Sequence, residues 1–234
     1  MDYSIFVYVI LTVLVVALGW FVNLPAVRSE RMSCDIRCGG TEGGAGCFRG
    51  GERKDRACGV IRQEMLNGIL IAAVFLLLFA VSACRIAVGN DYWVYRSDFL
   101  LIEQDRHVAF EFGFVWLVRF LQSVLNHDQY LPIFAFFSFF TVLFFVRGMA
   151  DISEQFCFTV FLLMTGGYYF SSLNSVRYYL VLAIALYSIK YVLQNEWGKF
   201  VLWVLLAAAF HKSVLVVIPF YFLASRNWKR RHML

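Results

Sequence analysis

Long apolar runs separated by short polar stretches make up most of this chain. Several runs approach the roughly 20 residues that a helix needs to cross the hydrocarbon core of a bilayer. A helix satisfies its backbone hydrogen bonds within its own segment, whereas an open sheet edge in lipid leaves them unsatisfied. The pattern therefore predicts helical spans at 3–22, 67–84, 129–146, 156–173 and 176–193.

Two further apolar stretches have a different pattern. Residues 112–125 are apolar but short, with Arg119 inside them, so we expect them to lie in or on one leaflet. Residues 197–225 form a longer run that is interrupted by His211 and Lys212. A hairpin of two short helices that turns at these residues accounts for the interruption, and one kinked helix is the alternative.

The basic residues predict an orientation. Arginines and lysines are concentrated in the loop at 24–66 and in the tail at 226–231, and cytoplasmic loops carry such an excess. The loop and the C-terminus should then be cytoplasmic, with the N-terminus outside. An odd number of crossings follows, about seven, together with an outer-leaflet or re-entrant helix. We therefore expect one all-α, polytopic transmembrane domain over 1–234, with an extracytoplasmic segment and its interfacial helix at 86–128.

Composition supports the membrane class. The chain is 61% hydrophobic and only 16% charged, which a soluble domain of this length could not bury. The net charge of +5 comes from basic residues in the flanking loops, so topology explains it better than nucleic acid does.

Four cysteines lie in the loop at 24–66. Their spacing lacks the paired C-x2-C knuckles of structural zinc sites, and a reduced cytoplasm disfavours disulfides. We expect a flexible loop and neither a metal nor a cofactor. These cysteines are Cys34, Cys38, Cys47 and Cys58.

Polar residues stand directly beside the apolar runs. A charge at the bilayer centre costs roughly 2.5–3.5 kcal/mol on insertion scales, so a chain with few charges places them there for a function. The predicted topology gathers all of them on the outer face. They are Arg85, Asp91, Arg96, Glu111, Asn174, Arg177, His211 and Lys212.

These residues belong to four short motifs that follow one another between 67 and 225: Arg85-x3-Gly89-Asn90-Asp91-Tyr92-x2-Tyr95-Arg96, Glu111-Phe112-Gly113, Asn174-Ser175-Val176-Arg177 and Phe210-His211-Lys212-Ser213. In this order and with this membrane spacing, they resemble the EpsG family of exopolysaccharide polymerases, which belongs with the Wzy-type O-antigen and capsule polymerases. The resemblance does not extend to the loop at 30–62.

The resemblance implies a GT-C-like fold and a multi-pass enzyme of the bacterial cytoplasmic membrane. Such enzymes join oligosaccharide repeat units that are carried on polyprenyl diphosphate, at the outer face of the membrane. The growing chain passes from one lipid carrier to a sugar hydroxyl of the next unit. The implied partners are the lipid-linked oligosaccharide, the bilayer and other polysaccharide-assembly membrane proteins.

The residue types fit this chemistry. Guanidinium groups bind phosphate oxygens bidentately and stay charged, so the diphosphate-binding candidates are Arg85, Arg96 and Arg177, with Lys212 as a point charge. The acceptor hydroxyl needs a proton acceptor, for which Asp91 and His211 rank ahead of Glu111. Flat rings cover the apolar faces of sugars. The sugar-binding candidates are Tyr92, Trp93, Tyr95 and Asn174.

Two departures from the family keep alternatives open. Tyr178 stands where many relatives have Gln, and the chain is shorter than is usual in the family. A flippase or transport component, a non-catalytic partner and an inactive truncated copy therefore remain alternatives. Simpler roles also exist, since Arg96 can snorkel to headgroups, Trp93 can belong to an interfacial aromatic belt and Asp91 can cap a helix.

Overall fold

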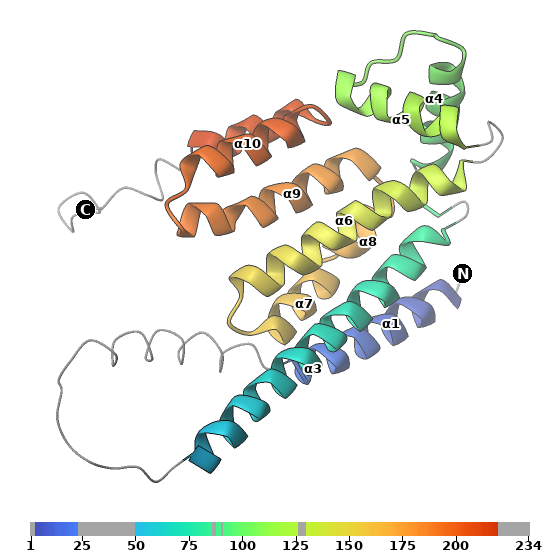
Figure 1. Ribbon diagram of the computed structural model, residues 1–234. Coiled ribbons are helices and arrows are strands. Elements are labelled where there is room, and N and C mark those ends of the chain that lie inside the picture. Colours follow the sequence, from blue (N-terminus) through green and yellow to red (C-terminus); the bar gives the residue numbers. More distant parts are fainter. Residues whose placement is uncertain (1–2, 23–49, 86–87, 90, 126–129, 220–234) are drawn as a thin grey trace, which may run out of the picture.

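The computed structural model describes residues 3–22, 50–85, 88–89, 91–125 and 130–219 (Figure 1). Every regular element within these residues is a helix. Three helical stretches are long and apolar enough to cross a membrane: residues Arg62–Ala83 of α3 (Gly50–Ala83), α6 (Leu131–Ile152) and α9 (Val176–Leu193). The prediction of an all-helical membrane protein is confirmed, whereas about seven crossings and the GT-C likeness remain predictions.

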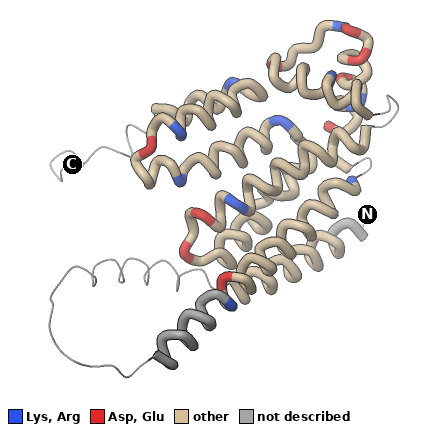
Figure 2. The backbone as a smooth tube through the Cα atoms, in the orientation of Figure 1, with Lys and Arg blue, Asp and Glu red and all other residues tan. Residues whose placement is uncertain are grey.

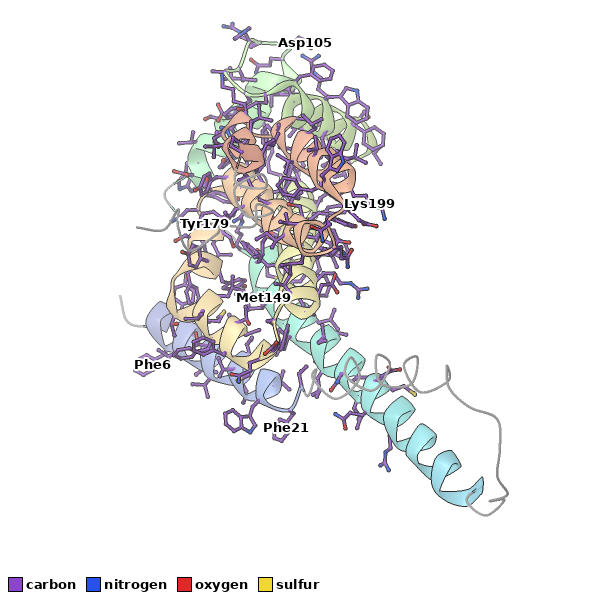
Figure 3. The ribbon with its side chains drawn as sticks, turned by 90° about the vertical axis from the view of Figure 1, so that its left-hand side faces the viewer. Phe6, Phe21, Asp105, Met149, Tyr179 and Lys199 are labelled. Carbon is purple, nitrogen blue, oxygen red and sulfur yellow. The ribbon has the colours of Figure 1, made fainter. Side chains whose placement is uncertain are left out.

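Helix α6 lies at the centre of the bundle. It packs against α3 on one side and against α9 on the other, and α10 (Trp197–Ala208) covers the far side of α9 (Figure 1). Helix α1 (Tyr3–Trp20) lies along α3 and α7. Apolar side chains face outward along α1 and directly after it: Phe6, on the helix, and Phe21, the residue after its end, are 65% and 68% exposed and point away from the bundle (Figure 3). Such a face suits contact with lipid.

Helices α4 (Tyr92–Glu103) and α5 (Phe112–Val124) lie together at one end of the bundle (Figure 1). Arg85 follows α3, and its guanidinium lies 4.8 Å from the ring of Phe134, in the first turn of α6. The chain therefore leaves α3 and enters α6 at the same end. Charged residues are concentrated at this end and at the opposite ends of α6 and α9, while the helix middles are almost free of them (Figure 2).

Two predicted boundaries are wrong. Helix α3 begins at Gly50, inside the stretch predicted as a loop at 24–66, because residues 52–64 are rich in good helix formers. The predicted span at 156–173 is divided into α7 (Phe156–Thr165) and α8 (Tyr168–Ser172). Gly167 has a φ of 76°, a conformation that glycine adopts without strain and that ends α7.

The turn predicted at His211 is present. Helix α10 ends at Ala208, and a short 3-10 helix, η1 (Lys212–Val216), follows directly after His211. Residues 217–219 follow η1 in helical conformation, and residues 220–225 of the predicted hairpin lie outside the described residues, as do Cys34, Cys38 and Cys47.

Candidate functional site

Glu111 is the centre of a cluster of charged groups. It directly precedes α5, and its Oε2 accepts a hydrogen bond of 2.6 Å from Nη1 of Arg177, in the first turn of α9. Its Oε1 lies 3.1 Å from Nδ1 of His211 and accepts a longer bond, 3.4 Å, from the backbone N–H of Lys212. We call Glu111, Arg177 and His211 the Glu111 cluster. Its members come from three elements that are distant in the sequence.

Gly113 allows α5 and α10 to approach closely enough to build this cluster. Its backbone N–H donates a 3.0 Å hydrogen bond to the carbonyl of Ala209, just after α10. A Cβ at position 113 would lie only 2.6 Å from that carbonyl oxygen, so no larger residue fits without a shift of the backbone. Glu111 and His211 each lie two residues from this contact, on the two elements that it joins.

The guanidinium of Arg177 is held against aromatic rings. Its central carbon lies 3.9 Å from the ring centre of Phe110 and 5.4 Å from that of Phe114. The side chain is 18% exposed, and its buried Nε has no hydrogen-bond partner among the described residues. Buried polar groups in proteins are nearly always paired, and the buried Nε of Arg85 is the other guanidinium nitrogen without a partner among the described residues. Arg177 differs from Arg85 in that part of its side chain is exposed beside Glu111.

The electrostatics separate two carboxyl groups near Arg177. Burial raises the pKa of Glu111, but hydrogen bonds from the backbone, His211 and Lys212, together with the charge of Arg177, outweigh it and lower the pKa below its ordinary value. Burial raises the pKa of Asp98 on α4, and the charge of Arg177 opposes this only in part. Glu111 therefore stays ionised and acts as an anchor, whereas Asp98 holds a proton more readily.

Asp98 was missed by the sequence analysis. It lies in the middle of α4, one turn after Tyr95, away from all four motifs. The one available signal is its spacing of seven residues from Asp91, which puts both acids on the same side of a helix.

Arg85 has a different environment from Arg177. It is only 4% exposed, and its Nη1 donates to the backbone carbonyls of Ser172 at 3.3 Å and Leu173 at 2.6 Å. Burial lowers the pKa of its guanidinium to about 10, so it remains charged at neutral pH. These contacts hold the turn that leads into α9.

Gly89 reinforces this contact. Its φ is +89°, and a Cβ there would lie 2.2 Å from Oδ1 of Asn174. Arg85 and Gly89 thus clamp the turn at 172–174 just before Arg177. The Arg85-x3-Gly89 motif thus packs against the turn that precedes α9, and the Arg85 side chain is buried there.

The remaining candidates fall into two groups. Tyr95 is 5% exposed within a group of phenylalanine rings, and Tyr92 stacks on Phe134 at 5.1 Å, so both pack the protein interior. Trp93 is 57% exposed, with the Arg96 guanidinium 5.5 Å from its ring. The side chains of Asn174 and Lys212 are also exposed.

Asp91 caps α4 without a side-chain hydrogen bond. Within the described part of the chain, no hydrogen bond or ion pair joins it to the Glu111 cluster.

Comparison with known proteins identifies one family. The model of the EpsG family matches residues 68–234, which is more than half of the chain and includes every member of the Glu111 cluster. No curated protein and no solved structure matches the chain.

Proposed function

The chain belongs to the EpsG family, and on this premise we propose that it polymerises oligosaccharide repeat units carried on polyprenyl diphosphate, at the outer face of the bacterial cytoplasmic membrane. The observation that supports this proposal is the Glu111 cluster. It brings a phosphate-binding guanidinium and an imidazole to the same carboxylate, at the end of the bundle where the exposed polar residues of the motifs also lie.

Arg177 is the proposed ligand of the diphosphate. Glu111 occupies one of its Nη groups, and the aromatic rings of Phe110 and Phe114 fix the plane of the guanidinium. The unpaired Nε belongs to the fork that binds phosphate oxygens. A cation fixed in this way stabilises the charge that develops on the diphosphate as its bond to the sugar breaks, without reorganisation during the reaction.

His211 is the proposed general base. When its Nδ1 carries the proton, it donates to the ionised carboxylate of Glu111, and Nε2 is left as a proton acceptor. Among the described residues, no group hydrogen-bonds to Nε2. The acceptor hydroxyl oxygen then attacks the anomeric carbon of the growing chain, its proton moves to Nε2, and the lipid diphosphate leaves with the electron pair of the broken C–O bond.

The exposed candidates complete the proposed site. Arg96 and the ammonium group of Lys212 can supply outer contacts to the diphosphate, and Trp93 and Asn174 can contact the sugars. Asp91 and Asp98 are the alternative bases, on the neighbouring helix α4.

The test is polymerisation by purified protein in lipid nanodiscs that contain lipid-linked oligosaccharide extracted from the source membranes. Wild type should produce a ladder of longer chains on a gel. His211→Asn keeps a donor for Glu111 but removes the base, so we expect the rate to fall by about 10²–10⁴-fold. His107→Asn, which changes an exposed histidine outside the cluster, is the matched control.

Two outcomes would contradict the proposal. A wild-type protein that makes no longer chains would exclude the polymerase function for this chain. Normal elongation by His211→Asn together with loss of elongation in Asp98→Asn would instead assign the base to Asp98 on α4.

A further inference from the structure

An apolar groove of about 380 Å³ lies between α7 and α9, with α6 as its floor. We call it the α7–α9 groove. Its walls include Leu162 on α7 and Leu182 and Ile189 on α9, Met149 lies on its floor, and Val217 borders it just after η1. Leu162 and Ile189 are 47% and 37% exposed, so the groove is open at the surface of the bundle, along helices expected to lie in lipid.

Two structural elements connect this groove to the Glu111 cluster. On α9, Tyr178, Leu182, Ala185 and Ile189 follow one another at the i, i+4, i+7, i+11 spacing of one helix face, and the last three line the groove. Tyr178 heads this row, and its ring centre lies 6.1 Å from that of His211. The second connection is η1, which begins directly after His211 and ends directly before Val217.

The distance along α9 is short. Leu182 follows Arg177 by five residues and Ile189 by twelve, which correspond to roughly 7 Å and 18 Å along the helix axis. Along the helix axis, Arg177 therefore lies about one and a half turns from the near end of the groove. Its side chain projects toward Glu111 and Phe110, on another side of α9, so the route from the Glu111 cluster to the groove passes Tyr178. The far end reaches deep into the segment expected to cross the membrane.

We propose that the α7–α9 groove binds the first isoprene units of the polyprenyl chain whose diphosphate is held at Arg177. This inference rests on the proposed function. In a polyprenyl diphosphate, one hydrocarbon chain is joined directly to the diphosphate, so the chain must enter apolar surroundings immediately beside the charged cluster. A diacyl phospholipid has a glycerol spacer and two chains, for which a single groove this close to Arg177 is a poorer match.

The groove also suggests a role for Tyr178, the residue that departs from the family pattern. Its side chain is 46% exposed and lies between the imidazole of His211 and the apolar row that begins at Leu182. A ring with an apolar body and a polar hydroxyl suits the point where the diphosphate ends and the hydrocarbon chain begins.

The test compares the binding of a long-chain polyprenyl diphosphate and of inorganic diphosphate to purified protein in detergent, by native mass spectrometry. Ile189→Trp places a large ring in the groove from a position that is already exposed. We expect it to weaken polyprenyl diphosphate binding by about tenfold and leave inorganic diphosphate binding unchanged, because only the hydrocarbon contacts are lost. Arg177→Ala should weaken the binding of both.

The matched control is Val13→Trp. Val13 is 62% exposed and lines a separate apolar cavity of about 290 Å³ between α1 and the end of α7. This variant should bind both ligands like wild type.

Three outcomes would overturn the inference: unchanged binding in Ile189→Trp, equal weakening in Val13→Trp, or displacement of the polyprenyl diphosphate by an equal concentration of diacyl phosphatidate. A wild-type protein that does not elongate chains, but whose binding of polyprenyl diphosphate is weakened by Ile189→Trp, would instead contradict only the proposed polymerase function.

Discussion

Two ion pairs near opposite ends of α9 have similar geometry but different surroundings. Arg177 pairs with Glu111 at 2.6 Å, and Lys190 pairs with Asp151 at 3.0 Å. Each cation also lies against an aromatic ring, Arg177 at 3.9 Å from Phe110 and Lys190 at 3.6 Å from Tyr187. By distance and exposure alone, either pair could be taken for a functional site.

The two pairs differ in the further contacts of their charged groups and in the hydrogen-bonding groups that remain unpaired. Lys190 and Asp151 join the ends of α9 and α6, two helices already packed along their length, and among the described residues no histidine or further acid contacts them. Glu111 holds His211 as well as Arg177, and Arg177 keeps an unpaired buried Nε. A closed pair stabilises the fold, whereas unused hydrogen-bonding capacity in a partly open cluster can bind and react.

The largest expected effect separates the two pairs by activity. Glu111→Gln should reduce polymerisation by about 10²-fold or more, because the neutral amide neither anchors Arg177 nor orients His211. Asp151→Asn, the equivalent change at the other pair, should retain the wild-type rate within about threefold while lowering Tm slightly. The measurement is the elongation rate of each variant in nanodiscs. Equal losses of rate would show that the Lys190–Asp151 pair matters for activity as much as the Glu111 cluster does.

The second prediction concerns the clamp behind Arg177. Arg85→Ala removes two hydrogen bonds from a buried charge to backbone carbonyls, at about 1.5–3 kcal/mol each. Tm in detergent should fall by several degrees, and the affinity for inorganic diphosphate should fall with it because Arg177 is displaced. Arg96→Ala, at an exposed position, is the matched control and should change Tm little. If the two variants were equally stable, Arg85 would not act as a clamp.

The third prediction tests the close approach of α5 to α10. Gly113→Ala should cost about 1–3 kcal/mol and displace Glu111 from His211, because the added carbon would meet the Ala209 carbonyl. Gly198→Ala is the control, since a Cβ there has no atom within 4 Å. Thermal unfolding in detergent and the elongation rate are measured together. A Gly113→Ala protein with unchanged rate and Tm would show that the contact is not needed.

The smallest effect is a pH dependence. The folded-state pKa of Glu111 is lowered, so its ionised form stabilises the folded protein above the ordinary Glu pKa of about 4.3. This stabilisation is lost as the pH falls through the lowered pKa. The Tm of Glu111→Gln should therefore decrease less than the Tm of wild type when the pH falls from about 6 to about 3. Parallel acid profiles of Tm would contradict the strong pairing of Glu111.

The membrane class, most of the helices and the family can be predicted from the sequence alone. Lipid allows few backbone solutions, so apolar runs of sufficient length predict helices directly, and α6 and α9 lie close to where those runs predict them. The same local rules missed the break at Gly166-Gly167, because an apolar run continues through a turn that glycine conformation alone allows.

Which polar residues lie in contact follows from the packing of the helices and not from the sequence pattern. Glu111 meets Arg177 across 66 positions and His211 across 100, and no local pattern determines contacts at such separations. The packing also buries Arg85 against the turn before α9. It lowers the pKa of Glu111 and raises the pKa of Asp98, because burial and charged neighbours together determine the pKa of a carboxyl group. The sequence supplied the chemical groups, and the packing of α5, α9 and α10 gave each of them its role.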